Sequence, residues 1–95
     1  MAAWRDDLEG GLVQVITDAA ELKRKCLREA PDADDICDWA DEMASMAGEV
    51  CYVEASDEST RSYELRATSP GKMSGCWSIP FDATILLHAP SGAAR

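Results

Sequence analysis

The second half of the chain places aromatic and acidic side chains in the same short stretches, a combination that can bind a cationic group. Aromatic rings attract cations through their electron-rich faces, and nearby carboxylates add Coulomb attraction. Seven residues form the candidate ligand-binding set: Tyr52, Asp57, Glu58, Tyr63, Glu64, Trp77 and Phe81. The alternative for each aromatic ring is a place in the hydrophobic core. The chemistry implied is binding of a basic segment rather than catalysis.

Residues that could support catalysis or metal binding are few and widely spaced. The cysteines are Cys26, Cys37, Cys51 and Cys76, and no two of them form a Cys-x-x-Cys pair. His88 is the only histidine, and no spacing orients a third group for a Cys–His nucleophile. Structural zinc sites usually contain a tight ligand pair, whereas free cysteine on an apolar face behaves as a small hydrophobe. We therefore expect no catalytic residue, no metal and no cofactor.

The segment 29–42 is strongly acidic, with seven Asp or Glu residues and no basic one. Residues 34–38 match the letters of the Asp-Asp-x-x-Asp magnesium motif of isoprenoid synthases, but 95 residues are too few for the large cavity those enzymes need. A calcium loop starting at Asp32 also fails, because Cys37 stands where glycine is required and Met43 where glutamate is required. Acidic residues in front of a helix do suit its positive end.

Composition favours one globular domain with an acidic surface. The chain has 95 residues, 46% of them apolar, and a formal net charge of −9. This charge repels a nucleic-acid backbone and favours a basic peptide or protein as partner. No apolar run reaches the roughly 20 residues of a membrane span, and the N-terminus turns acidic at once instead of forming a secretory signal. We expect a soluble, cytoplasmic protein without membrane insertion.

Two helices are expected in the first half. Asp18 can cap the first one, and Glu21 stands at the capping-box spacing. Its apolar stripe runs from Ala19 to Ala30, and Pro31 ends it. The second helix shows a broader stripe before Gly48, which is placed to end it in a left-handed turn. The stripe consists of Ile36, Trp39, Ala40, Met43, Ala44 and Ala47.

Five short strands surround these helices and predict a mainly β domain. The β-branched run 12–16 precedes the helices, and two alternating runs, 49–54 and 61–67, follow them across a polar hairpin loop. A turn is expected at residues 69–72. We expect the last elements at 76–79 (strand), 80–83 (3₁₀ turn) and 85–87 (strand), and the domain at 11–88 between a flexible lead-in, 1–10, and a flexible tail, 89–95.

Strands with a 3₁₀ turn before the last one are typical of a small SH3-like β-barrel, here with two helices inserted after the first strand. The run 39–43 (Trp-Ala-Asp-Glu-Met) leading to Gly48, the strand pair, and Trp77 before the Pro-containing turn resemble the repeat modules of the Mind bomb family of ubiquitin ligases. Related modules occur in the plant ligase Keep on Going. Cys51 stands near the place of the family's second glycine, and the 56–60 loop lacks its Asp-Gly turn.

The resemblance implies a non-catalytic recognition module, because in that family a separate RING domain performs the ubiquitin chemistry. The leading hypothesis is therefore a domain that binds a protein or basic peptide, with substrate recognition within a ubiquitin-ligase-like or scaffold protein as its role. The alternative is an assembly domain that docks through the acidic face around Asp34, Asp35 and Asp38. A methyl-lysine reader and a Cys/His enzyme are the remaining readings.

Overall fold

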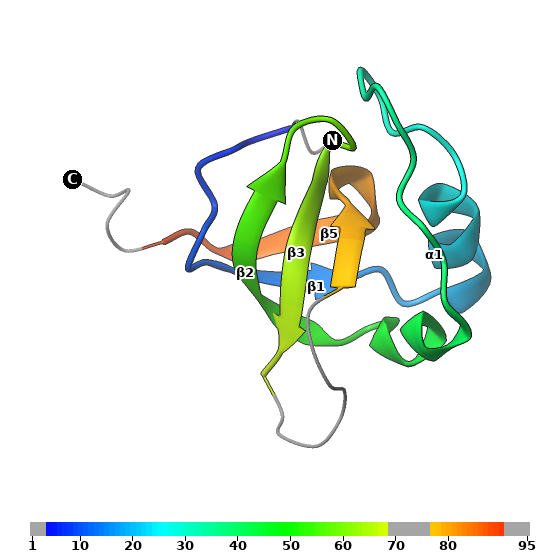
Figure 1. Ribbon diagram of the computed structural model, residues 1–95. Coiled ribbons are helices and arrows are strands. Elements are labelled where there is room, and N and C mark those ends of the chain that lie inside the picture. Colours follow the sequence, from blue (N-terminus) through cyan, green and yellow to red (C-terminus); the bar gives the residue numbers. More distant parts are fainter. Residues whose placement is uncertain (1–3, 69–76, 91–95) are drawn as a thin grey trace.

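The computed structural model describes residues 4–68 and 77–90, and these form a five-stranded antiparallel sheet with helices (Figure 1). The strand order is β4-β3-β2-β1-β5. The mainly β class and the order of the elements agree with the sequence-based expectation. In chain order the elements are β1 (Leu12–Val15), α1 (Ala19–Cys26), η1 (Asp41–Met46), β2 (Val50–Asp57), β3 (Ser62–Ala67), β4 (Trp77–Pro80), η2 (Phe81–Ala83) and β5 (Thr84–His88).

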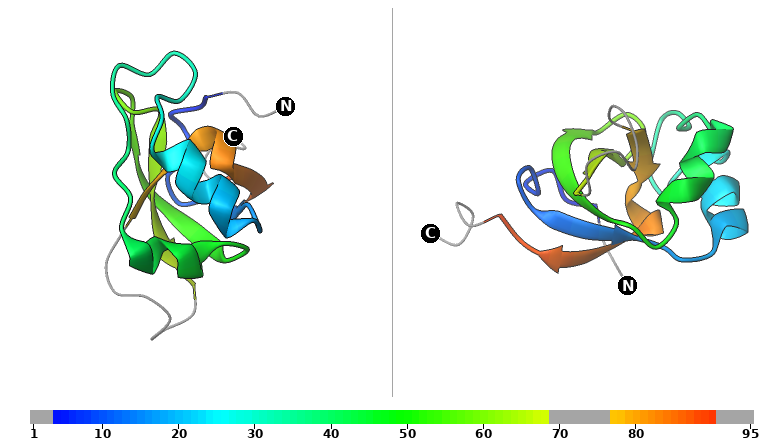
Figure 2. Two further views of the ribbon diagram at one scale, coloured as in Figure 1. Left: turned by 90° about the vertical axis from the view of Figure 1, so that its right-hand side faces the viewer. Right: turned by 90° about the horizontal axis from the view of Figure 1, so that it is seen from below.

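The sheet is strongly curled, and its topology requires this. Strands β4 and β5 lie at opposite edges, yet only the 3₁₀ turn η2 joins them. In a flat sheet the two edges would be about 19 Å apart, whereas the four peptide steps from Pro80 to Thr84 reach at most about 13 Å. The edges therefore approach each other at η2 (Figure 2). Within the described residues β4 and β5 are not paired, so the sheet does not close into a barrel.

Helix α1 begins as the sequence predicts but ends earlier. The Asp18 carboxylate accepts hydrogen bonds from the N–H groups of Ala20 (2.9 Å) and Glu21 (3.2 Å). The helix ends at Cys26 rather than running to Ala30. Glu29 instead forms an isolated antiparallel bridge with Ile36, so the chain has already left the helix before Pro31 and turns back within residues 30–35.

The second helix is much shorter than predicted, and it is a 3₁₀ helix. Only Asp41–Met46 is helical, whereas the apolar stripe predicted a helix from Ile36 to Ala47. The like charges of Asp34, Asp38 and Asp41 would face each other at helical spacings of three and four residues, which destabilises a helix. The prediction that Gly48 ends this helix in a left-handed turn is confirmed, because Gly48 follows η1 and has a φ of +81°.

The core lies on the concave face of the sheet, where α1 and η1 pack beside each other near β4 (Figures 1 and 2). Buried side chains alternate along β2 and β3 as predicted and also along β1, and Leu22 and Cys26 of α1 join them. The segment before β1 also contributes: Leu8 is 3% exposed, and the ring of Trp4 stacks on that of Tyr63 with centroids 5.1 Å apart. None of the described helices is long and apolar enough to cross a membrane.

Candidate functional site

A pocket of about 370 Å³ lies between β4 and the segment that enters η1. We call it the tryptophan pocket, because Trp39 and Trp77 both line it. Both indole rings are half-buried, and each packs on the edge of the core. The other lining residues used below are Ile36, Asp38, Met43 and Asp57.

The pocket exists because residues 36–40 are extended rather than helical. The N–H groups of Asp34 and Asp35 donate hydrogen bonds to the carbonyl oxygen of Ser59, at 2.7 and 3.1 Å. These bonds hold the acidic segment against the turn between β2 and β3. The Ala40 N–H donates to the sulfur of Met43 at 3.2 Å, which closes the entry to η1. An extended wall therefore faces β4 across the pocket.

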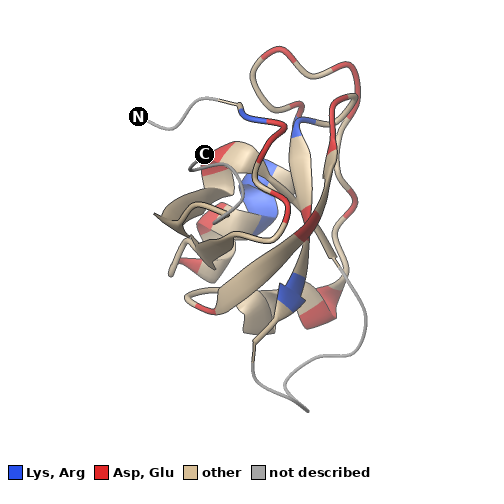
Figure 3. Cartoon of the chain, turned by 90° about the vertical axis from the view of Figure 1, so that its left-hand side faces the viewer, with Lys and Arg blue, Asp and Glu red and all other residues tan. Residues whose placement is uncertain are grey.

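The charge at the pocket is negative. Asp38 and Asp57 are its two ionisable carboxyls, both exposed, and no Lys, Arg or His is among its described lining residues. Asp57 is held in place, because its Oδ1 accepts hydrogen bonds from the N–H (3.0 Å) and the hydroxyl (2.7 Å) of Ser59. Figure 3 shows further acidic residues along the loop that follows α1. Two indole rings beside two carboxylates form a site that suits a cationic side chain.

The Trp77 indole adds an unused hydrogen-bond donor. Its Nε1 is buried and has no hydrogen-bond partner among the described residues. Leaving such a donor unpaired costs about 1–3 kcal/mol.

The described cysteines are suited to packing rather than to reaction. Cys26, Cys37 and Cys51 are free and buried. Burial raises the pKa of the Cys26 thiol to about 12 and that of Cys51 to about 11. Burial also raises the pKa of Cys37, which lines the pocket, although hydrogen bonds with Ser62 and Thr60 offset part of the shift. These thiols stay protonated at neutral pH and are poor nucleophiles.

No metal-binding cluster of three or more His, Cys, Asp or Glu residues occurs in the described part of the chain. His88 is exposed at the end of β5. Cys76 lies outside the described residues, as do the turn predicted at 69–72 and the end of the tail, 91–95.

The structure brings only Trp77 and Asp57 of the seven candidate residues together at the tryptophan pocket. Tyr63 is 2% exposed, and burial raises the pKa of its phenol. Phe81 is 5% exposed and faces a different hollow, described below. Tyr52 and Glu64 point to the outer face of the sheet, since they alternate with buried neighbours. Glu58 is exposed in the turn after β2, outside the pocket lining.

The sequence pattern missed the other wall of the pocket. Ile36, Asp38, Trp39 and Met43 were assigned to a helix, with the apolar ones in its core-facing stripe. Ile36 is in fact 40% exposed, and Met43 is buried at the base of the pocket. The density of carboxylates around Trp39 is the feature that argues against a helix there.

Comparison with protein-family models, with curated proteins and with solved structures finds no match to this chain.

Proposed function

We propose that this domain is a non-catalytic recognition module that binds a basic segment of a partner protein in the tryptophan pocket. The observation that carries the proposal is the meeting of Trp39 and Trp77 with the carboxylates of Asp38 and Asp57 around one pocket of about 370 Å³. A lysine or arginine side chain of the partner enters between the indole rings. Its positive charge is attracted by the ring faces and by the two carboxylates.

The fold supports the same proposal. An SH3-like barrel requires a curled five-stranded sheet whose edges approach each other at a 3₁₀ turn. We include in the proposal that the domain is such a barrel. Small barrels of this kind bind extended segments in aromatic-lined grooves. Together with the resemblance to Mind bomb repeats, this favours substrate recognition within a cytoplasmic ubiquitin-ligase-like or scaffold protein.

The proposal is tested by titrating the domain with a capped ten-residue peptide that contains lysine and arginine, followed by backbone amide shifts and tryptophan fluorescence. We expect the largest shifts at Trp39, Trp77 and their neighbours. Trp39→Ala should weaken binding about 3- to 30-fold, the range of a partly desolvated cation–π contact. A peptide with trimethyl-lysine distinguishes a methyl-lysine reader, which would bind it more tightly than the unmodified form.

A matched pair of charge variants makes the test specific. Asp38→Asn removes a carboxylate from the pocket, and Glu64→Gln removes one from the outer face of the sheet. Asp38→Asn should weaken binding several-fold, whereas Glu64→Gln should change it much less. Equal effects of the two variants, or shifts clustered at Tyr52 and Glu64, would refute the tryptophan pocket as the binding site.

A further inference from the structure

The second edge of the sheet, β5, exposes an uninterrupted aliphatic run. The side chains of Ile85, Leu86 and Leu87 are 53%, 42% and 49% exposed. β5 pairs with β1 on one side, and within the described residues no strand lies on its other side. An exposed aliphatic edge strand is a template for pairing with another extended segment.

The direction of the backbone hydrogen bonds shows which groups of β5 are available. The Val15 N–H donates to the Glu49 carbonyl on the β2 side of the sheet, at 2.9 Å, so odd-numbered β1 residues are directed toward β2. Even-numbered residues are then directed toward β5, and the Ile16 N–H accordingly donates to the Ala83 carbonyl at 3.0 Å.

Gln14 is directly opposite Ile85, and Val13 is opposite Leu86. Ile85 therefore uses its backbone N–H and C=O for pairing with β1. By the alternation of an antiparallel strand, the backbone groups of Thr84 and Leu86 point away from the sheet. The Thr84 N–H already donates to the Phe81 carbonyl at the end of η2. The free edge thus offers the N–H and C=O of Leu86 and the C=O of Thr84.

A hollow of about 830 Å³ lies next to this edge. Its apolar lining includes Trp4, Ile16, Phe81 and Leu86, so the edge strand and the hollow form one continuous apolar surface. We call the two together the β5 surface. Aliphatic side chains of a strand added to β5 would have room in the hollow.

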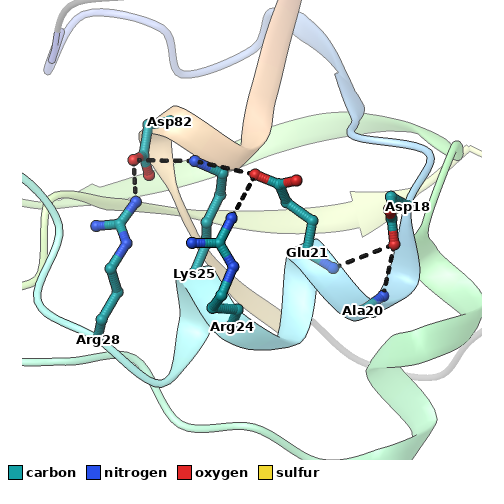
Figure 4. A network of polar contacts seen from close by, with 7 residues as sticks. All are labelled: Asp18, Ala20, Glu21, Arg24, Lys25, Arg28 and Asp82. Carbon is teal, nitrogen blue, oxygen red and sulfur yellow. Dashed lines mark hydrogen bonds and ion pairs between the residues drawn. The ribbon is translucent and has the colours of Figure 1, made fainter.

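The charged residues that line the hollow are balanced in an otherwise acidic chain: Lys25 and Arg61 face Asp32 and Asp82. Lys25 and Arg28 of the α1 region both pair with Asp82, and Lys25 and Arg24 both pair with Glu21 (Figure 4). Three cations therefore share two carboxylates.

Arg61 adds a cation that has no carboxylate partner among the described residues. Its Nε donates to the carbonyl oxygen of Asp32 at 3.3 Å, and its guanidinium lies over the ring of Trp4, 5.5 Å from the centroid. Arg61 and Lys25 both line the hollow. Lys25 already pairs with Asp82, so Arg61 is the lining cation that a carboxylate of a bound segment can pair with.

We infer that the β5 surface binds an extended segment of a partner protein that combines aliphatic and acidic residues. The segment adds a strand to β5 through the N–H and C=O of Leu86 and the C=O of Thr84. It places aliphatic side chains in the hollow and directs a carboxylate to Arg61. This is a second site, separate from the tryptophan pocket and opposite to it in charge preference. It does not depend on the function proposed for that pocket.

The test uses two capped nine-residue probe peptides, one alternating valine with glutamate and one alternating valine with lysine. Hydrogen exchange of single backbone amides is followed by NMR. In the free protein the Leu86 amide should exchange rapidly and the Ile85 amide slowly. The valine–glutamate peptide should slow exchange at Leu86 at least tenfold, and the valine–lysine peptide should not.

Two substitutions of Leu86 distinguish binding through backbone hydrogen bonds from binding through side-chain contact. Leu86→Ala keeps the outward N–H, whereas Leu86→Pro removes it, and proline is tolerated where an edge-strand N–H faces outward. Binding of the valine–glutamate peptide should fall about threefold in Leu86→Ala and more than tenfold in Leu86→Pro. Arg61→Asn, which suits the positive φ of 49° at this position, should weaken the same peptide several-fold.

Four results would overturn the inference. These are slow exchange of the Leu86 amide in the free protein, equal binding of the two peptides, unchanged binding by Leu86→Pro, and a dimer in sedimentation that Leu86→Pro dissociates. The last result would assign the edge to a second copy of the chain. Thermal unfolding of each variant verifies that it is folded before its binding is compared.

Discussion

The described cysteines show how burial sets the chemistry of a single side chain. Cys26, Cys37 and Cys51 differ in sequence surroundings, yet all three are buried and their thiols have raised pKa values. The absence of tight spacing predicted packing rather than ligation for these residues. The size of the pKa shifts depends on desolvation by parts of the chain far away in sequence, so spacing alone could not supply it.

We predict very slow alkylation of Cys26 in the native protein. With a thiol pKa of about 12, only about one molecule in ten thousand carries the thiolate at pH 8. Iodoacetamide labelling followed by peptide mass spectrometry should show Cys26 modified roughly a thousandfold more slowly than in urea. Labelling rates that are equal in the native and unfolded protein would contradict the burial of this thiol.

Local patterns predicted the strands and caps but not the acidic segment. Alternation in β2 and β3, the Asp18 cap and the η2 turn depend on neighbours a few residues apart, and they occur as expected. The extended wall before η1 depends on hydrogen bonds from Asp34 and Asp35 to Ser59, a residue of a different element. Periodicity cannot detect such a contact, and it therefore misassigned Trp39 to a helix.

The exit from η1 depends on the backbone of Gly48, and we predict a measurable cost for replacing it. A Cβ at this position would be 3.6 Å from Cγ2 of Thr17, an ordinary contact, so space is available. The cost comes from φ +81°, which strains a residue with a side chain by about 1–2 kcal/mol.

Urea unfolding of Gly48→Ala should show this loss, and Gly48→Asn should lose less, because asparagine tolerates the left-handed conformation. If alanine were as stable as glycine here, the conformation of the turn would be different from the one described.

On the scale of the whole molecule, the described part of the lead-in, residues 4–10, is attached to the sheet. Leu8 and Trp4 lie outside the domain boundary that the sequence suggested, yet both pack on the core. The lead-in is also tied to the sheet by backbone bonds from Gly10 to the Val53 carbonyl, 2.8 Å, and from Val53 to that of Gly11, 3.0 Å. A short polar stretch with one leucine has no periodicity that could reveal this role.

Replacing Leu8 should therefore destabilise the entire domain. Leu8→Ala removes a side chain that is 3% exposed and should cost about 2–5 kcal/mol, a large part of the roughly 5–15 kcal/mol typical of folded domains. Glu9→Ala, at the exposed neighbouring position, is the control and should change the free energy of unfolding by less than about 0.5 kcal/mol. Similar results for both variants would mean that the lead-in does not pack on the sheet.

The charge of the whole molecule makes a kinetic prediction for the tryptophan pocket. The net charge is −9 and the radius of gyration is 12.2 Å. At about 0.01 M salt the screening length is about 30 Å, so an approaching basic peptide is attracted by the charge of the whole molecule. At about 1 M salt the screening length is about 3 Å, and only carboxylates in direct contact, such as Asp38, still attract the peptide.

The association rate of a lysine- and arginine-containing peptide should therefore fall at least tenfold over this range of salt, while its dissociation rate changes much less. Stopped-flow tryptophan fluorescence measures both rates. Asp38→Asn should raise the dissociation rate, because this carboxylate lines the pocket, whereas Glu64→Gln should affect only association at low salt. An association rate that does not depend on salt would show that the acidic surface does not steer the ligand, and the basic-segment proposal would then lose its electrostatic support.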